Sequence, residues 1–255
     1  MFYINNKLRD EVYESNVRHF FWEYRRTYSE FVINLLDEFE EVFEELMHHD
    51  PKEVYFKKEN KPEGAPTELA DIIIFILDHF GGSEPRVDID EAFLQEPDSH
   101  YKNDEYYEKI RNDTEYKPWQ YFIKVSDECK KYISLSNAYY CIHGNNSFTA
   151  DNGETISVPQ LLHKVIKLIL LFCDIYGINM QQELRRKIEY NKSRKPNYRH
   201  IGGSGDYETD FDKVYMELLH KGWPEQTDYV IEVRNQANKC AAKKREERKN
   251  LELES

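Results

Sequence analysis

The sequence predicts an all-α protein, and two observations carry that prediction. Apolar residues recur at helical spacing in several segments, and strand signals are nearly absent. Residues 65–82 show the clearest pattern, because Pro66 and Thr67 favour a helix start and Gly81-Gly82 favour its end. Apolar side chains lie on almost every side of this predicted helix, so we expect neighbouring helices to surround it in a bundle.

The remaining elements are predicted from the same signals of periodicity and chain breaks. In chain order they are helical residues 8–47 with a break near Arg26-Thr27, a loop at 48–64, a polar surface insert at 83–118, helices at 119–141 and 159–176, a fifth helix beginning at Asn179, and a tail at 206–255. We expect one helical domain over residues 1–205 and a C-terminal helical extension over 206–255.

A weak internal repeat links the central helix to a later one. Residues 65–73 align without gaps with residues 158–166, and each helix runs on toward a glycine. The second copy has Leu161 where the first has Glu68, and Lys164 where the first has Asp71. Residues 119–178 therefore form a degenerate second helix pair, and chance similarity between apolar helices is the alternative.

The composition of the chain limits the cellular location and the binding partners that we expect. The chain has 255 residues and a formal net charge of −13, so we expect a soluble protein that does not bind nucleic acid non-specifically. We expect no signal peptide and no membrane span, since no apolar run is long enough. The four cysteines contain no C-x-x-C pair, which favours reduced thiols and a cytoplasmic location over a zinc site or disulfides.

Two pairs of carboxylates stand out within the helical pattern. Glu38 and Glu41 lie one turn apart on one predicted helix, and Glu68 and Asp71 lie one turn apart on the next. If the two helices pack antiparallel, the four acids converge and need a cation, for which all-oxygen ligands favour Mg²⁺ first and Mn²⁺ second. A solvated acidic face is the alternative for the first pair, and Asp78 is either a further site acid or a helix-end carboxylate.

Four motifs follow one another along the chain: Asp37-Glu-Phe-Glu-Glu-Val-Phe-Glu-Glu45, Lys61-Pro-Glu-Gly-Ala-Pro-Thr-Glu-Leu-Ala-Asp71, Lys187-Ile-Glu-Tyr-Asn191 and Tyr198-Arg-His200. They resemble the motifs of the MazG-like nucleotide pyrophosphohydrolases, of the all-α NTP pyrophosphatase superfamily. The resemblance covers about residues 30–82 and 177–203. It implies a helical bundle that assembles as dimers or tetramers, here expected as a homodimer. It also implies hydrolysis of a nucleoside triphosphate to the monophosphate and pyrophosphate.

The resemblance also implies roles for individual residues. Glu38, Glu41, Glu68 and Asp71 would hold Mg²⁺, with Glu41 as the general base that deprotonates the attacking water. The substrate-binding residues would be Lys61, Lys187, Asn191, Arg194 and Arg199. The loop after Arg194 departs from the family pattern at Lys195, Asn197, Ile201 and Ser204, which puts its contacts in question.

Two alternatives remain open at the level of the sequence. The chain is a non-catalytic helical module that binds a nucleotide or a protein partner, or it is an enzyme for a modified or signalling nucleotide. Taken alone, Lys187 and Asn191 would more often belong to an exposed helix face. No pattern in the sequence indicates which base or sugar is bound.

Overall fold

The computed structural model describes residues 4–18, 27–57, 60–83, 86–89, 117–143, 148–149 and 155–194. The chain divides into two compact units, one of Met1–Tyr13 with Thr27–Ser193 and one of Glu14–Arg26 with Arg194–Ser255. Of the second unit, only residues 14–18 and Arg194 are described. The elements that form the site all belong to the first unit. The predicted surface insert lies mostly outside the described residues, and the predicted tail lies wholly outside them.

Helices dominate the described part of the chain, so the all-α prediction is confirmed. The helices are α1 (Asn6–Arg18), α2 (Tyr28–His48), α3 (Ala65–Gly82), α7 (Pro118–His143), α8 (Val158–Tyr176) and α9 (Met180–Ser193). Four two-residue strands form two antiparallel hairpins: β1 (Tyr55–Phe56) with β2 (Pro62–Glu63), and β3 (Phe148–Thr149) with β4 (Thr155–Ile156). None of the described helices is long and apolar enough to cross a membrane.

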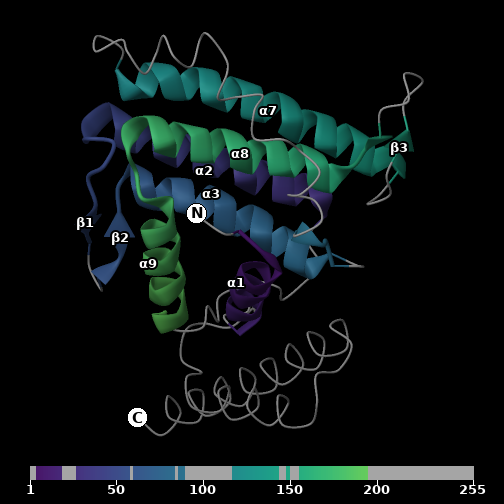
Figure 1. Ribbon diagram of the computed structural model, residues 1–255, viewed down its shortest axis with the longest axis horizontal. Coiled ribbons are helices and arrows are strands. Elements are labelled where there is room, and N and C mark those ends of the chain that lie inside the picture. The colour runs from purple at the N-terminus through teal and green to yellow at the C-terminus, as the bar shows by residue number, and fades with distance from the viewer. Residues whose placement is uncertain are drawn as a thin grey trace, which may run out of the picture. The chain divides into compact units, whose positions relative to one another are not determined.

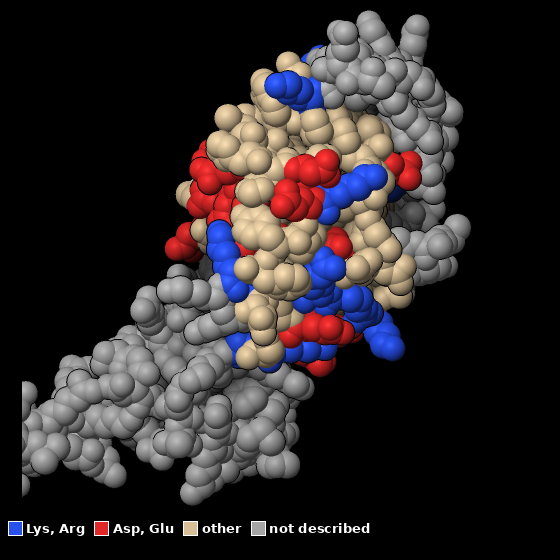
Figure 2. Space-filling model, turned by 90° about the vertical axis from the view of Figure 1, so that its left-hand side faces the viewer, with Lys and Arg blue, Asp and Glu red and all other residues tan. Residues whose placement is uncertain are grey.

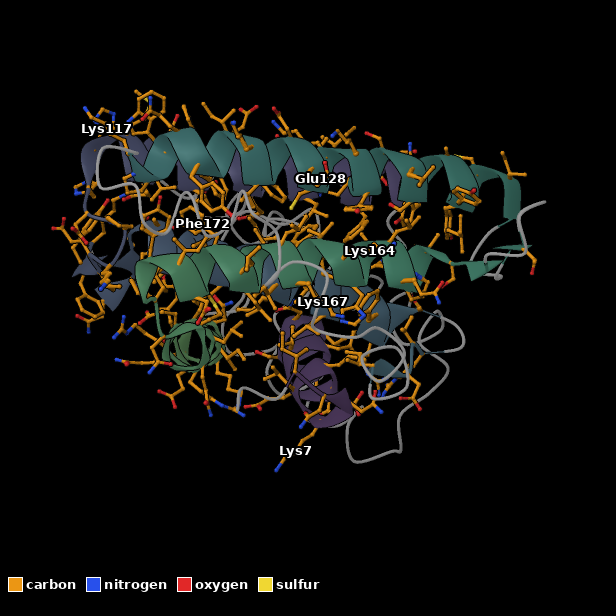
Figure 3. All side chains as sticks on the ribbon, turned by 45° about the horizontal axis from the view of Figure 1, so that its top comes forward. Lys7, Lys117, Glu128, Lys164, Lys167 and Phe172 are labelled. Carbon is orange, nitrogen blue, oxygen red and sulfur yellow. The ribbon has the colours of Figure 1, made fainter. Side chains whose placement is uncertain are left out.

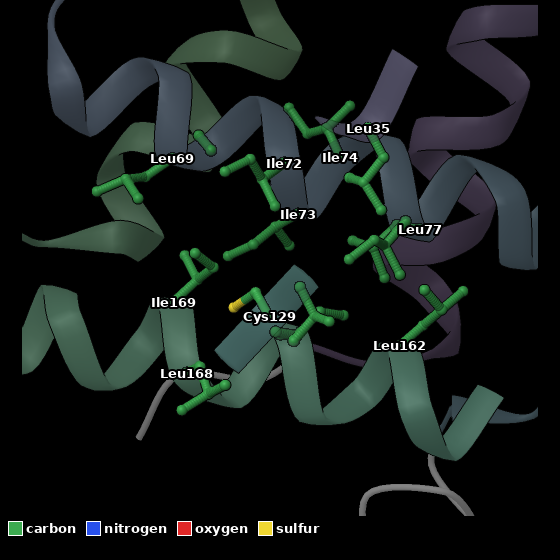
Figure 4. Close-up of a cluster of buried hydrophobic side chains, with 14 of the residues drawn as sticks. Leu35, Leu69, Ile72, Ile73, Ile74, Leu77, Cys129, Leu162, Leu168 and Ile169 are labelled. Atoms are coloured by element: carbon green, nitrogen blue, oxygen red, sulfur yellow. The ribbon is translucent and has the colours of Figure 1, made fainter. Parts of the chain in front are cut away.

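The helix α3 lies at the centre of the first unit and packs against α2, α8 and α9 (Figure 1). Its apolar side chains point in several directions, and Leu69, Ile72, Ile73, Ile76 and Leu77 are fully buried. Figure 4 shows Leu69, Ile72, Ile73 and Leu77 facing side chains from α2, α7 and α8. Burial of one such side chain contributes about 2 kcal/mol, so α3 anchors the bundle as its sequence predicts.

The helix starts follow the local sequence. Thr27 caps α2, because its hydroxyl accepts the Glu30 N–H at 3.2 Å while its own N–H donates to the Glu30 carboxylate at 2.7 Å. Gly64 precedes α3 with φ of 115°, a conformation that favours glycine. Its carbonyl accepts the Thr67 hydroxyl at 2.8 Å and the Glu68 N–H at 3.2 Å. The chain can therefore turn sharply from β2 into α3.

Two intervals predicted as loops or turns contain the hairpins, which corrects the sequence analysis. Residues 48–64 include β1 and β2, and the interval between α7 and α8 includes β3 and β4. Each strand is only two residues long, too short for an alternating apolar pattern to reveal it. The hairpin β1–β2 matters for the site because it ends one residue before α3 begins.

The internal repeat extends well beyond the two aligned helices. We call α2–β1–β2–α3 the first repeat and α7–β3–β4–α8 the second repeat. Three elements of the second repeat begin 93 positions after their counterparts, as shown by Tyr55 and Phe148, Pro62 and Thr155, and Ala65 and Val158. Six of the seven buried residues of α2 also have a buried counterpart in α7, 94 positions later. The first such pair is Tyr28 and Phe122, and the last is Val42 and Ser136. The predicted second helix pair therefore repeats the element order, the spacing and most of the burial pattern of the first repeat.

The two repeats meet through aromatic contacts at both ends of an antiparallel α2–α7 pair. Tyr28 stacks on Tyr140 with 4.2 Å between ring centroids and donates its hydroxyl to Ser136 at 2.8 Å. At the other end, the ring of Phe43 meets the ring of Trp119 edge to face, with 6.3 Å between ring centroids. Within the second repeat, the ring of Phe172 on α8, labelled in Figure 3, meets the ring of Phe122 on α7 edge to face, with 5.3 Å between ring centroids. These contacts hold the bundle together away from the polar residues discussed below.

We predict that Gly64→Ala destabilises the protein by about 3 kcal/mol. An added Cβ would lie 2.2 Å from the Glu53 carbonyl oxygen, on a backbone that cannot yield, and φ of 115° disfavours any side chain. Gly177→Ala is the matched control, with φ of 64° and only the flexible Lys52 side chain nearby, and it should cost about 1 kcal/mol. Urea unfolding followed by circular dichroism measures both, and equal losses would contradict the prediction.

Candidate functional site

Antiparallel packing of α2 and α3 brings the predicted acids together. Phe31 stacks on Phe75 and on His79, with 5.6 Å and 4.2 Å between ring centroids, which fixes the register of the two helices. Further along the pair, Glu38, Glu41 and Glu68 each place one carboxylate oxygen within 4.8 Å of the others. The predicted convergence of acids from two helices is therefore present for these three residues.

Asp71, the fourth predicted acid, lies outside this group of three close oxygens and is connected to it through a buried lysine. The Lys187 Nζ lies 2.5 Å from Asp71 Oδ2 and 3.8 Å from Glu68 Oε2. Lys187 comes from α9, which packs against α3, and only 3% of its surface is exposed. We call Glu38, Glu41, Glu68 and Asp71 the carboxylate cluster. Lys187 lies against the cluster and is not on an exposed helix face, the alternative considered from sequence alone.

Burial and mutual repulsion make the cluster costly without a cation. Burial is the main cause that raises the pKa of Glu68 to about 9; Lys187 lowers the pKa, and the nearby Asp71, Glu63 and Glu41 raise it. Burial and then Asp71 and Glu41 raise the pKa of Glu38 to about 8. At an effective dielectric near 20, two charges about 5 Å apart repel by about 3 kcal/mol. The cluster therefore favours either protons or a cation.

The donor set fits a hard divalent ion. Glu68 is 2% exposed, and its Oε1 is buried without a hydrogen-bond partner in the described structure. A buried carboxylate oxygen without a partner is costly, and a cation is one way to satisfy it. Since every donor is a carboxylate oxygen, the set suits Mg²⁺ or Mn²⁺ better than Zn²⁺. Glu68 also lies in the first turn of α3, where the helix dipole favours negative charge.

A second polar layer borders the cluster on the β1–β2 hairpin, and sequence reasoning missed it. Glu63 on β2 is 4% exposed and forms ion pairs with Lys61 and, at 3.3 Å, with Lys57. Tyr55 on β1 donates its hydroxyl to Glu45 at 2.9 Å. Figure 2 shows the side of the molecule that carries this hairpin, where acidic and basic side chains lie next to one another. The two-residue strands gave no sequence signal for this layer.

The predicted substrate-binding residues divide into three groups. Lys187 and Asn191 lie one turn apart on α9, and Asn191 Oδ1 is buried without a hydrogen-bond partner in the described structure. Lys61 is partly exposed but is already paired with Glu63. Arg194 is exposed, and Arg199 lies outside the described residues. The buried Asp78 does not belong to the group of three close carboxylates.

The second repeat has no counterpart of the carboxylate cluster. At the equivalent positions stand Tyr132, Leu135, Leu161 and Lys164. The Lys164 Nζ lies 5.4 Å from the centre of the Tyr132 ring, so the counterparts of Asp71 and Glu38 form a cation–π pair. Hence the aligned positions carry different chemistry in the two repeats.

A separate cavity of about 320 Å³ opens between α2 and α7. Aromatic and charged side chains line it, among them Phe39, Phe43, Phe122, Asp127 and Lys130. Its acidic lining residues from α2 are Glu40 and Glu44, and no member of the carboxylate cluster takes part. The cavity is therefore distinct from the carboxylate cluster.

Comparison with known proteins adds no assignment. No family model matches the chain, and no curated protein and no solved structure is significantly similar to it. The resemblance to MazG-like enzymes therefore depends on the motifs themselves and on where the structure places them.

We predict that the metal-free protein loses stability as pH rises through the raised pKa of Glu68. A carboxyl with a folded-state pKa near 9 and an unfolded value near 4.5 stabilises the fold fully below pH 4.5, and this contribution disappears as pH approaches 9. Glu68→Gln removes this titration. The free energy of unfolding of the variant, relative to that of wild type, should therefore increase by on the order of 2 kcal/mol between pH 5 and 9. Urea unfolding in the presence of a chelator measures this, and a constant difference would contradict it.

Proposed function

We propose that this protein is a Mg²⁺-dependent nucleoside triphosphate pyrophosphohydrolase that releases pyrophosphate and a nucleoside monophosphate. The observation that carries the proposal is the carboxylate cluster, with a partnerless buried oxygen on Glu68 and a buried lysine from a third helix. Stability does not require such a costly group of acids, because Tyr132, Leu135, Leu161 and Lys164 fill the same place in the second repeat. The homodimer implied by the resemblance is part of the proposal.

Glu38, Glu41, Glu68 and Asp71 would hold the ion, which when bound neutralises phosphate oxygens and polarises the phosphorus for attack by water. The chain's own residues supply the remaining functions. Glu41 is the exposed member of the cluster, so solvent water reaches it most easily and it is placed to accept the proton of the attacking water. Lys187 contributes a positive charge that stabilises the charge developing on the leaving pyrophosphate.

The rest of the substrate contacts follow from the polar groups around the cluster. Asn191, one turn after Lys187, offers an amide for the phosphate or the nucleoside. Lys57 and Lys61 on the hairpin would add positive charge near the outer phosphates. The carboxylate of Glu63, which pairs with both lysines, partly neutralises that charge. Together these groups favour a polyanionic substrate that arrives with its own divalent ion.

We predict that the protein releases pyrophosphate from at least one member of a panel of NTPs and dNTPs in the presence of Mg²⁺. Glu68→Gln should lower that rate by about 100-fold or more, since it removes the most buried acid of the cluster. A coupled colorimetric assay measures pyrophosphate, and circular dichroism checks that the variant is folded.

Glu40→Gln is the matched control for this test. It changes the same residue type on the same helix, but Glu40 is exposed and lines the separate cavity. The control should retain the wild-type rate. If no nucleotide in the panel releases pyrophosphate while nucleotides still raise the melting temperature, the chain is a binding module and the proposal is wrong.

A further inference from the structure

The position of Lys187 has a consequence for how the carboxylate cluster accepts an ion. Its ammonium group lies 2.5 Å from Asp71 Oδ2 and 3.8 Å from Glu68 Oε2, and its side chain is 4% exposed. Among the described residues, Lys187 is the cation within ion-pair distance of Asp71 and Glu68. The Lys187 side chain therefore partly neutralises the acids that a metal ion would otherwise neutralise.

We propose that Lys187 is an internal counter-cation, which holds Asp71 in the metal-free protein and is released from it when a divalent ion enters. This inference rests on the proposed function, because it concerns the regulation of the same site. Entry of the ion and release of the lysine are then one event. The freed ammonium becomes available to a substrate phosphate only when the ion is present.

The residues around Lys187 allow this exchange. A lysine ammonium is a compact charge on a flexible four-carbon stem, so it can shift by a few ångströms without moving α9. The Asp71 side chain is 21% exposed, which leaves one edge of the cluster open to an entering ion. Asn191 lies one turn further along α9 on the same face, and its buried Oδ1 has no hydrogen-bond partner in the described structure. That oxygen is an acceptor for the released ammonium.

The exchange makes ion and phosphate binding cooperative. An ion that displaces Lys187 from Asp71 presents a positive group to a phosphate, and a bound phosphate in turn keeps the lysine away from Asp71. By linkage, each ligand then raises the affinity for the other. A lysine that served only as a fixed phosphate ligand would give no such dependence on Asp71.

We predict that Lys187→Met binds Mn²⁺ about 10-fold more tightly than wild type in the absence of nucleotide, because the competing cation is gone. Titration of the full chain, followed by the electron paramagnetic resonance signal of free Mn²⁺, measures the affinity. Lys192→Met is the matched control, since Lys192 lies on the same helix but is exposed and pairs with Glu11 at 2.7 Å. Its affinity should equal that of wild type.

A double-mutant cycle separates exchange from simple loss of charge. In the Asp71→Asn background the lysine has lost its principal partner, so Lys187→Met should change Mn²⁺ affinity by less than 3-fold. Inorganic pyrophosphate should raise the Mn²⁺ affinity of wild type, once the Mn²⁺ that pyrophosphate binds in a protein-free titration is subtracted, and should have a much smaller effect in Lys187→Met. An unchanged or weaker affinity in Lys187→Met, or an equal gain in the Asp71→Asn background, would overturn the inference.

The remaining outcomes are also decisive. If metal-free Lys187→Met is unfolded, the inference requires that Mn²⁺ restore its circular dichroism spectrum, and failure of Mn²⁺ to do so overturns it. If wild type and variant both fail to bind Mn²⁺, the metal site and the proposed function fall together with this inference. If the affinities change as expected but no nucleotide is hydrolysed, the proposed function alone is wrong.

Discussion

The structure depends on compensating negative charge beside an apolar helix. The helix α3 must be buried because almost every side of it is apolar, yet its first two turns carry Glu68 and Asp71. Packing that protects the isoleucines also removes water from these acids. A cation has to replace the lost hydration. Lys187 of α9 supplies part of that positive charge, whereas Glu38 and Glu41 of α2 add to the negative charge.

The two repeats share one framework, but the first repeat carries the group of buried acids and the second does not. Where the first repeat has four acids, the second has a tyrosine ring, two leucines and a lysine that lies over the ring. Both copies preserve the hairpin and the buried spacing of their helices. The bundle can thus form around either set. This difference supports our proposal that the acids serve chemistry, since the framework of a repeat does not require them.

Much of this arrangement could be predicted from the sequence, because strong local signals specify it. The breaks at Thr27 and Gly64 and the apolar run of α3 located the central helices, and the spacing of the acid pairs predicted their convergence. The hairpins could not be predicted, since two-residue strands leave no periodic trace. The burial of Lys187 could not be predicted either, because it depends on α9 packing against α3 across a long separation in the chain. Local patterns carry no information about such contacts.

That separation affects the order in which the protein is made. Asp71 and Lys187 are 116 positions apart, and the whole second repeat is synthesised between them. On the ribosome, the acids of the first repeat emerge well before their lysine partner does. Until α9 arrives, nothing in the described part of the nascent chain neutralises Asp71, so tight closure of α3 waits for a late, long-range contact. The placement of one lysine thereby delays maturation of the site until the second repeat and α9 have been synthesised.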